Sequence, residues 1–287
     1  MQQQNTVCDF NSSESWVILS PIEQSIKRKI EAVGTPLKDW DIRINYGIKT
    51  GFNDAFIIST EKRDEILANC KDEDERQRTA ELIRPILRGR DIKRYGYVDN
   101  GLYLINTHNG VRGRIPRIKI EDYPAIKAHL DQYWDKIEKR ADQGDTPYNL
   151  RNCAYLEDFN KPKVVWARLM RLSQSDINAF PRFSVVPSNV LVVDSLCFFT
   201  GSNIEQICSE LNSEYACWFF FNSVATLDNG GFQMRQQFIE NIPLPKINQI
   251  TKDIDTTIYN AFGFTSEEIL FIRTTNDNRK SEILNDH

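Results

Sequence analysis

The sequence lacks the long apolar runs and paired cysteines that mark membrane and disulfide-rich proteins. No window of its 287 residues reaches the roughly 18 consecutive apolar residues that a membrane span needs. Its start, MQQQNTVCDF, also lacks the basic and then apolar order of a signal peptide. The chain has six cysteines and no C-x-x-C pair, so we expect reduced, mostly buried thiols. These absences predict a cytoplasmic protein with no membrane partner.

Complete catalytic motifs are missing as well. Gly47 to Asn53 has no Lys-Ser/Thr pair after its second glycine, so it is not a Walker A phosphate loop, and no G-x-G-x-x-G occurs. The chain has no Pro-Pro pair, which the Asp/Asn-Pro-Pro-Tyr/Phe motif of adenine-N6 methyltransferases requires. Its histidines, His108, His129 and His287, are too scattered for a zinc set. We therefore expect no catalytic residue, no metal site and no enzyme activity in this chain alone.

The charge is small in total and uneven in distribution. A formal net charge of −4 argues against a free-standing nucleic-acid binder, because neutralised phosphates supply most non-specific affinity. Between Arg84 and Lys119, however, nine Lys or Arg residues stand against only Asp91 and Asp99. A basic zone on an acidic body is a better guide than the total, and it favours a nucleic-acid surface. A basic face that is only solvated is the alternative.

The periodicity predicts helices around a set of short strands. SPIEQSIKRKIEAVG indicates a helix with Ser20 as N-cap, Pro21 at the first position and Gly34 as terminator. DIRINYGIKTGFNDAFIIS predicts two strands joined by a Gly-containing turn, and YGYVDNGLYLIN predicts a second hairpin. Further helices are expected over 61–87 with a break near Lys71, over 123–142, over 203–224 and over 253–262, and another is capped by Thr265-x-x-Glu268.

Strands without regular strand-helix alternation predict an α+β fold of mostly antiparallel, hairpin-linked strands flanked by helices, with a small C-terminal helical segment. The expected organisation is a flexible lead-in at 1–19, a main domain at 20–246, and a helical extension and tail at 247–287. The boundary is placed near Pro243-Leu244-Pro245, where the composition changes.

An ordered set of motifs carries a family resemblance. In chain order it comprises INYGIKTGFNDAFII, LIRPILRGRDIKRYGY, DYPAIKAHLDQYWDKIEKRADQGDTPYNLR, KPKVVWARL, LCFFTG, LNSEYACWFFF and GGFQMRQQFIENIPLP. Over about residues 20–275 this set resembles the C-terminal specificity (target-recognition) domain of TaqI-like adenine-N6 DNA methyltransferases, in the form fused into type IIG restriction-modification enzymes. Each motif alone is weak, and their order is what makes the resemblance specific.

The resemblance implies a non-catalytic chain that recognises a DNA sequence and positions duplex DNA for adenine-N6 methylation and linked restriction. Its partners would be double-stranded DNA and a linked or partner methyltransferase domain, which in the family lies N-terminal to this one. No cofactor is expected in this chain, and S-adenosylmethionine and Mg²⁺ are expected only in the associated catalytic domains. Because the chain begins at a methionine with little upstream, we expect a fragment or a separately made subunit.

Two segments are assigned to DNA by the resemblance. KTGFNDAF looks DNA-facing in the family, with a self-capping hairpin turn as the structural alternative. LDNGGFQMRQQFIENIPLP resembles the family's closing segment, and glutamine is a suitable partner for adenine N6 and N7. The candidate contacts are Lys49, Thr50, Asn53, Asn229, Gln233 and Arg235.

Three further segments are candidates on their chemistry. RPILRGRDIKRY clusters cations, which suit phosphates or guanine edges, although Asp91 offers one arginine an ion pair instead. NTHNGVRGRIPR is a polar loop long enough to enter a groove, and ARLMR places two arginines after a strand. Solvated surface and salt bridges are the alternatives. The candidates are Arg88, Arg90, Lys93, Arg94, Arg112, Arg114, Arg168 and Arg171.

Two other functional classes stay open at this point. Asp91-Ile92-Lys93 is an acidic-x-Lys triplet of the kind that metal-dependent nucleases use, although no Pro-Asp precedes it. The basic zone would also suit a protein-interaction subunit that meets an acidic partner.

Overall fold

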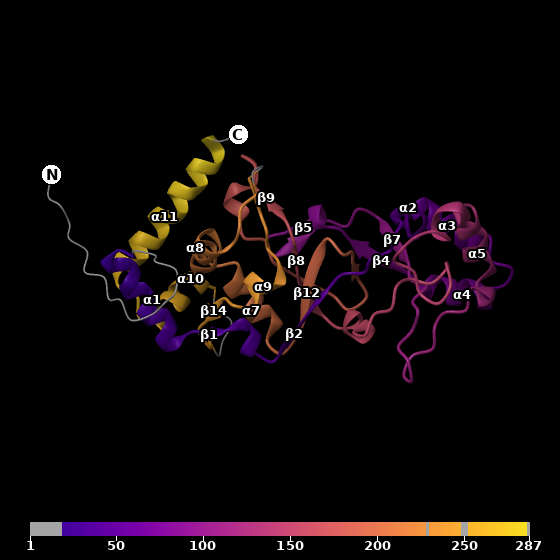
Figure 1. Cartoon of the computed structure of the whole chain (residues 1–287), viewed down its shortest axis with the longest axis horizontal. Coiled ribbons are helices and arrows are strands. Elements are labelled where there is room, and N and C mark those ends of the chain that lie inside the picture. Colours follow the sequence, from indigo (N-terminus) through magenta and orange to yellow (C-terminus); the bar gives the residue numbers. More distant parts are fainter. Residues whose placement is uncertain (1–18, 228–229, 248–251, 286–287) are drawn as a thin grey trace.

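The computed structural model describes residues 19–227, 230–247 and 252–285. Nearly all of the expected lead-in at 1–19 therefore lies outside the described residues. The molecule is elongated, with a bundle of helices at one end, a sheet in the middle and a second sheet with short helices at the other end (Figure 1). None of the described helices combines the length and apolar character that a bilayer crossing needs.

The middle sheet is antiparallel and carries much of the buried core. Its strands lie in the order β10 (Ser184–Val186), β8 (Lys163–Ala167), β12 (Leu196–Gly201) and β2 (Ile42–Tyr46). Every residue of β8 is buried, and the fully buried Trp166 packs against aromatic neighbours such as Phe183 and Phe199. A strand buried on both faces is a rigid base for the residues that follow it.

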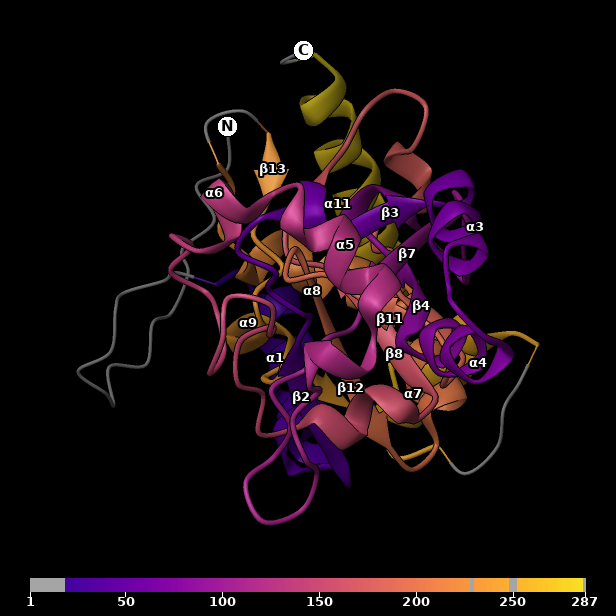
Figure 2. The ribbon, with the colours of Figure 1, turned by 90° about the vertical axis from the view of Figure 1, so that its right-hand side faces the viewer.

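The second sheet lies toward the other end of the molecule. Its order is β11 (Leu191–Val192), β4 (Ile83–Leu87), β7 (Leu102–Ile105) and β3 (Ile57–Ser59), and only the β11–β4 pair is parallel. The helices at this end are α2 (Asn53–Phe56), α3 (Thr60–Ala68), α4 (Glu73–Leu82), α5 (Pro124–Asp131) and α6 (Trp134–Ile137). Figure 2 views the molecule from this end, with α3, α4 and α5 toward the viewer. The expected break near Lys71 is confirmed, because α3 and α4 are separate helices.

Helices close the opposite end of the molecule. They are α1 (Pro21–Val33), α7 (Ile204–Leu211), α8 (Glu214–Ser223), α10 (Ile254–Phe262) and α11 (Ser266–Asn285). The Ser20 capping box of α1 is confirmed, and so is the cap that Thr265 and Glu268 form at the start of α11. The C-terminal helices pack on α1 and α8, and Lys29 reaches Glu268 at 2.6 Å. The expected helical extension thus shares its core with α1.

Both predicted hairpins are wrong. Strand β2 pairs with β12 and strand β3 pairs with β7, so residues 47–56 cross from one sheet to the other instead of turning back. Around Asp99-Asn100-Gly101, β7 pairs with β3 and β4, whereas β6 (Gly96–Tyr97) pairs with β5 (Ile92–Lys93). Strands β2, β3 and β7 pair with strands that are distant in the sequence, whereas β6 pairs with the preceding strand β5. The predicted α+β class with mostly antiparallel strands is confirmed.

Short ladders complete the fold around these layers. The remaining strands and α-helix of the described chain are β1 (Thr35–Pro36) with β14 (Pro243–Leu244), β9 (Met170–Arg171) with β13 (Gly231–Phe232), and the single-turn helix α9 (Gln236–Ile239). The cysteines at 70, 153, 197, 208 and 217 are all free thiols, as expected, and the last three are buried.

A buried acid predicts a pH dependence of stability. Glu210 on α7 is fully buried and accepts one hydrogen bond from Gln206 at 3.0 Å. Burial raises the pKa of Glu210 to about 8 from an ordinary value of 4.5. The folded state therefore holds the proton more tightly than the unfolded state, and its stability falls as the pH rises from about 4.5 to about 8.

We expect Glu210→Gln to flatten this part of the stability profile, because the amide keeps the contact with Gln206 and never ionises. Urea unfolding at the two ends of that pH range measures the effect. Glu205→Gln, an exposed position on the same helix, is the matched control and should leave the profile unchanged. Equal pH dependence in wild type and Glu210→Gln would contradict the assignment.

Candidate nucleic-acid interface

A hollow of about 800 Å³ opens beside the end of β8. Four separate parts of the described chain contribute to its lining, within 88–93, within 167–171, at 176 and 182, and at 227, 233 and 235, together with Ser195. Asp176 is the one carboxylate among its described lining residues. We call this site the first hollow. Its cationic lining residues are Arg88, Arg90, Lys93, Arg168, Arg171, Arg182 and Arg235.

A buried carboxylate shapes the first of these segments. Asp91 is 1% exposed, and its carboxylate accepts hydrogen bonds from the Arg88 backbone N–H at 2.8 Å and from the Asn100 amide at 2.8 Å. The Arg88 guanidinium also reaches this carboxylate, at 3.3 Å, so the ion pair considered as an alternative exists for Arg88. The exposed side chains of Arg90 and Lys93 make no such contact within the described part of the chain. Asp91 thus fixes the turn and leaves two cations free to bind an anion.

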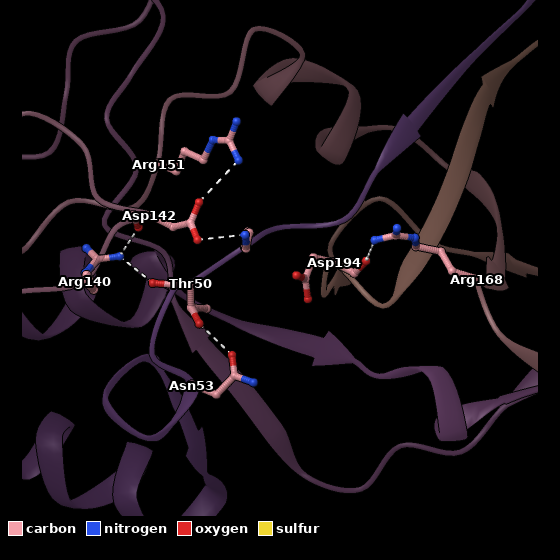
Figure 3. A network of polar contacts seen from close by, with 8 residues as sticks. Thr50, Asn53, Arg140, Asp142, Arg151, Arg168 and Asp194 are labelled. Carbon is pink, nitrogen blue, oxygen red and sulfur yellow. Dashed lines mark hydrogen bonds and ion pairs between the residues drawn. The ribbon is translucent and has the colours of Figure 1, made fainter. Parts of the chain in front are cut away.

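The second segment leaves the buried strand β8 and turns into β9. The Arg168 backbone N–H donates to the Ser195 carbonyl at 3.0 Å, and its guanidinium donates to the Asp194 carbonyl at 3.0 Å (Figure 3). Its guanidinium also lies 5.3 Å from the centre of the Tyr46 ring. Arg171 stands opposite Gly231 in the β9–β13 ladder and is exposed.

The closing segment is held to β8 by one side chain. The buried indole N–H of Trp166 donates to the Met234 carbonyl at 2.8 Å, and Met234 itself is fully buried. The neighbours of Met234, half-buried Gln233 and exposed Arg235, both line the first hollow. Asn229 lies outside the described residues, so the structure does not place it.

Arg182 belongs to the same wall and escaped the sequence analysis. Its side chain is 13% exposed and donates to Asp176 at 2.9 Å and to the Arg171 carbonyl at 3.0 Å. Burial lowers the pKa of Arg182, and Asp176 opposes that shift. The available signal was its place two residues before the β-branched run that forms strand β10.

A second hollow of about 430 Å³ adjoins the first, because Arg168 lines both. Its lining also includes Tyr46, Lys49, Arg151 and Asp194. The Asp142 carboxylate forms ion pairs with the Lys49 ammonium at 2.8 Å and with the Arg151 guanidinium at 3.3 Å (Figure 3). The hydrogen bonds to Lys49 and Arg151 help to lower the pKa of Asp142, and the bond to Lys49 is the largest cause. Arg151 is another cation that the sequence analysis missed.

A buried arginine organises the crossing segment beside the second hollow. The Arg140 guanidinium donates to the Thr50 carbonyl and, at 2.6 Å, to the Asp142 carbonyl, and it lies 4.5 Å from the Phe56 ring centre (Figure 3). Burial lowers the pKa of Arg140 to about 10. The Thr50 hydroxyl is buried and donates to the Asn53 side chain at 2.6 Å. This local bond is the self-capping alternative, although the segment is not a hairpin.

Three predicted cations lie apart from both hollows. The Arg94 guanidinium donates to the backbone carbonyls of Asn178 and Asn212. Arg114 pairs with Glu157 at 2.6 Å. Arg112 is exposed on its loop and lines neither hollow. Seven of the fourteen predicted residues thus meet at the first hollow, and Lys49 lies at the second.

Comparison with known proteins identifies a shared fold. No protein-family model and no curated protein sequence matches the chain. Among solved structures it is similar to the type IIL restriction-modification enzyme MmeI in complex with DNA, with a TM-score of 0.57 and 13% identity, over 86% of this chain and 36% of that one. It is also similar to the type IIG restriction endonuclease BpuSI, with a TM-score of 0.52 and 14% identity, over 91% and 32%. The chain therefore spans about a third of each enzyme's length.

The role of Asp91 in holding the basic turn can be tested by Asp91→Asn. The amide cannot accept from both the Arg88 backbone and Asn100, so we expect the free energy of unfolding to fall by about 1–3 kcal/mol. Urea unfolding measures the loss. Asp99→Asn, at an exposed carboxylate that follows β6, is the matched control with little expected change. Equal stability of the two variants would show that Asp91 does not hold the turn.

Proposed function

We propose that this chain is a non-catalytic DNA target-recognition domain of a restriction-modification enzyme. It would position duplex DNA for adenine-N6 methylation and linked restriction by a catalytic domain outside this chain. The observation that carries the proposal is the convergence of seven cationic side chains from four separate segments on one hollow. Such a wall would attract a polyanion even though the chain as a whole carries a net charge of −4.

The lining separates into groups suited to phosphate and groups suited to bases. Arg90, Arg171 and Arg235 are exposed at the rim and suit phosphate oxygens, which set register without reading sequence. Gln233 lies among them with a side-chain amide, which pairs in two-point fashion with adenine N6 and N7. Anchoring of this segment through Trp166 keeps the reading group in place.

The two similar solved structures also support a DNA-related role for this chain. Both are described as restriction enzymes, and the MmeI structure contains DNA. Since this chain spans about a third of each, the proposal assigns it the recognition task and leaves the reaction to the remaining part. S-adenosylmethionine and Mg²⁺ would then bind in the associated catalytic domains.

The nuclease alternative finds little support in the geometry of Asp91. Its carboxylate is buried and already accepts from Arg88 and Asn100, so it is poorly placed to hold a metal ion. Within residues 19–227, 230–247 and 252–285, no three acidic, histidine or cysteine side chains gather closely enough to hold one. An acidic protein partner would meet the same cations, and binding of duplex DNA separates that alternative from this proposal.

The rim cations provide the direct test. We expect Arg90→Ala with Arg171→Ala to weaken binding to a random-sequence duplex and to reduce the salt slope by about 2, since each lost phosphate contact removes roughly 0.9. Fluorescence anisotropy across a series of salt concentrations measures both quantities. The folded structure should persist, because both side chains are exposed and make no ion pair with another described residue.

The matched control is Lys27→Ala with Arg28→Ala on α1, which removes the same charge from a helix that lines neither hollow. Its slope should equal that of the wild type. If both double variants change binding equally, only net charge matters and the first hollow is not the DNA site.

A further inference from the structure

The second hollow contains an aromatic side chain that a phosphate-binding wall does not require. Tyr46 is 41% exposed at the end of β2 and lines this hollow. The Arg168 guanidinium lies 5.3 Å from its ring centre and limits the orientations of the ring. An exposed aromatic ring on a fixed strand offers a flat surface on which a nucleic-acid base can stack.

Two cations stand across the same hollow. The side chains of Lys49 and Arg151 are 49% and 60% exposed, and both are oriented by the single carboxylate of Asp142 (Figure 3). One carboxylate between two cations leaves a positive charge that a phosphate group can neutralise. Because Arg140 fixes the Asp142 backbone, the two cations are arranged before any ligand arrives.

The backbone on this side of the hollow is fixed at a close approach. A side chain at Gly47 would place its Cβ 2.0 Å from the Val193 carbonyl oxygen, so only glycine fits there. Ile48 forms a parallel bridge with Val193, and the Asp194 N–H donates to the Ile48 carbonyl at 2.9 Å. These contacts set the position of Tyr46 relative to Lys49.

We propose that the second hollow binds one unpaired nucleotide of the DNA, with its base on Tyr46 and its phosphate at Lys49 and Arg151. The inference rests on the proposed DNA-binding function and adds a site to it. The volume of about 430 Å³ lies within the roughly 300–1,000 Å³ of small-ligand sites. Arg168 lines both hollows, so a strand bound in the first could place a displaced nucleotide in the second.

The test compares three duplexes of one sequence against the full chain by fluorescence anisotropy. One duplex is fully paired, one carries a single extrahelical adenosine, and one carries an abasic residue at that position. The adenosine bulge should bind about tenfold more tightly than the abasic bulge, because stacking on one aromatic ring contributes that much. Tyr46→Ala should remove this preference, and Tyr46→Phe should retain it.

Tyr95→Ala is the matched control. Tyr95 is also an exposed tyrosine beside an arginine, because the Arg94 guanidinium lies 5.5 Å from the centre of its ring. Tyr95 lines neither hollow. Its substitution should leave the adenosine preference intact.

Equal binding of the adenosine and abasic bulges, or a preference that survives Tyr46→Ala, would overturn this site alone. The proposed function would stand as long as duplex binding depends on Arg90 and Arg171. Failure to bind any of the three duplexes would overturn both proposals. If free adenosine monophosphate displaced the bulged duplex when both were present at equal concentration, the second hollow would be a site for a free nucleotide and not for DNA.

Discussion

Mutual repulsion among cations is the constraint that the first hollow must overcome. Seven cationic side chains line it, with Asp176 as the one carboxylate among its described residues. Other contacts must therefore hold the cation-bearing segments together. Two of these contacts come from buried side chains, Trp166 and Asp91. The Trp166 indole holds the closing segment, and the Asp91 carboxylate holds the turn before β5. Both hold backbone groups in place. The exposed side chains of Arg90, Arg171 and Arg235 make no ion pair with another described residue, so they stay available for a ligand.

The two hollows follow from how the chain moves between its sheets. Strand β2 ends at Tyr46 in the middle sheet, and the chain then crosses through Gly47 to the second sheet. The crossing places Lys49 near Arg168, which itself leaves the buried strand β8. A chain that turned back as a hairpin would have kept these cations on one sheet. The positive surface is therefore a product of topology as much as of composition.

Capping signals in the sequence predicted helix starts correctly, whereas residues 83–87, expected as the end of a helix, form strand β4. The cap of α1 depends on Ser20 and Glu23, which are three residues apart, and the cap of α11 on Thr265 and Glu268 has the same spacing. The hairpins failed because pairing partners lie elsewhere in the chain: Tyr46 is opposite Cys197, more than a hundred residues away. Periodicity within a segment carries no information about such a partner.

Some residues of the candidate site could be predicted from the sequence, and others could be recognised only in the fold. The basic cluster around Gly89 was visible in the sequence, and most of its cations do meet at the first hollow. Arg94 was indistinguishable from Arg90 by pattern, yet its partners are distant carbonyls that only the fold brings near. The sequence analysis missed Arg151 and Arg182 because neither stands in a cationic run, and only the fold brings them to the hollows.

The central claim, that separate segments form one DNA-binding surface, is tested most directly by hydrogen–deuterium exchange of the chain with and without duplex DNA. We expect joint protection of residues 88–93, 168–171 and 231–235, with no change in 254–285. Protection confined to one of these segments, or located mainly in the C-terminal helices, would contradict it.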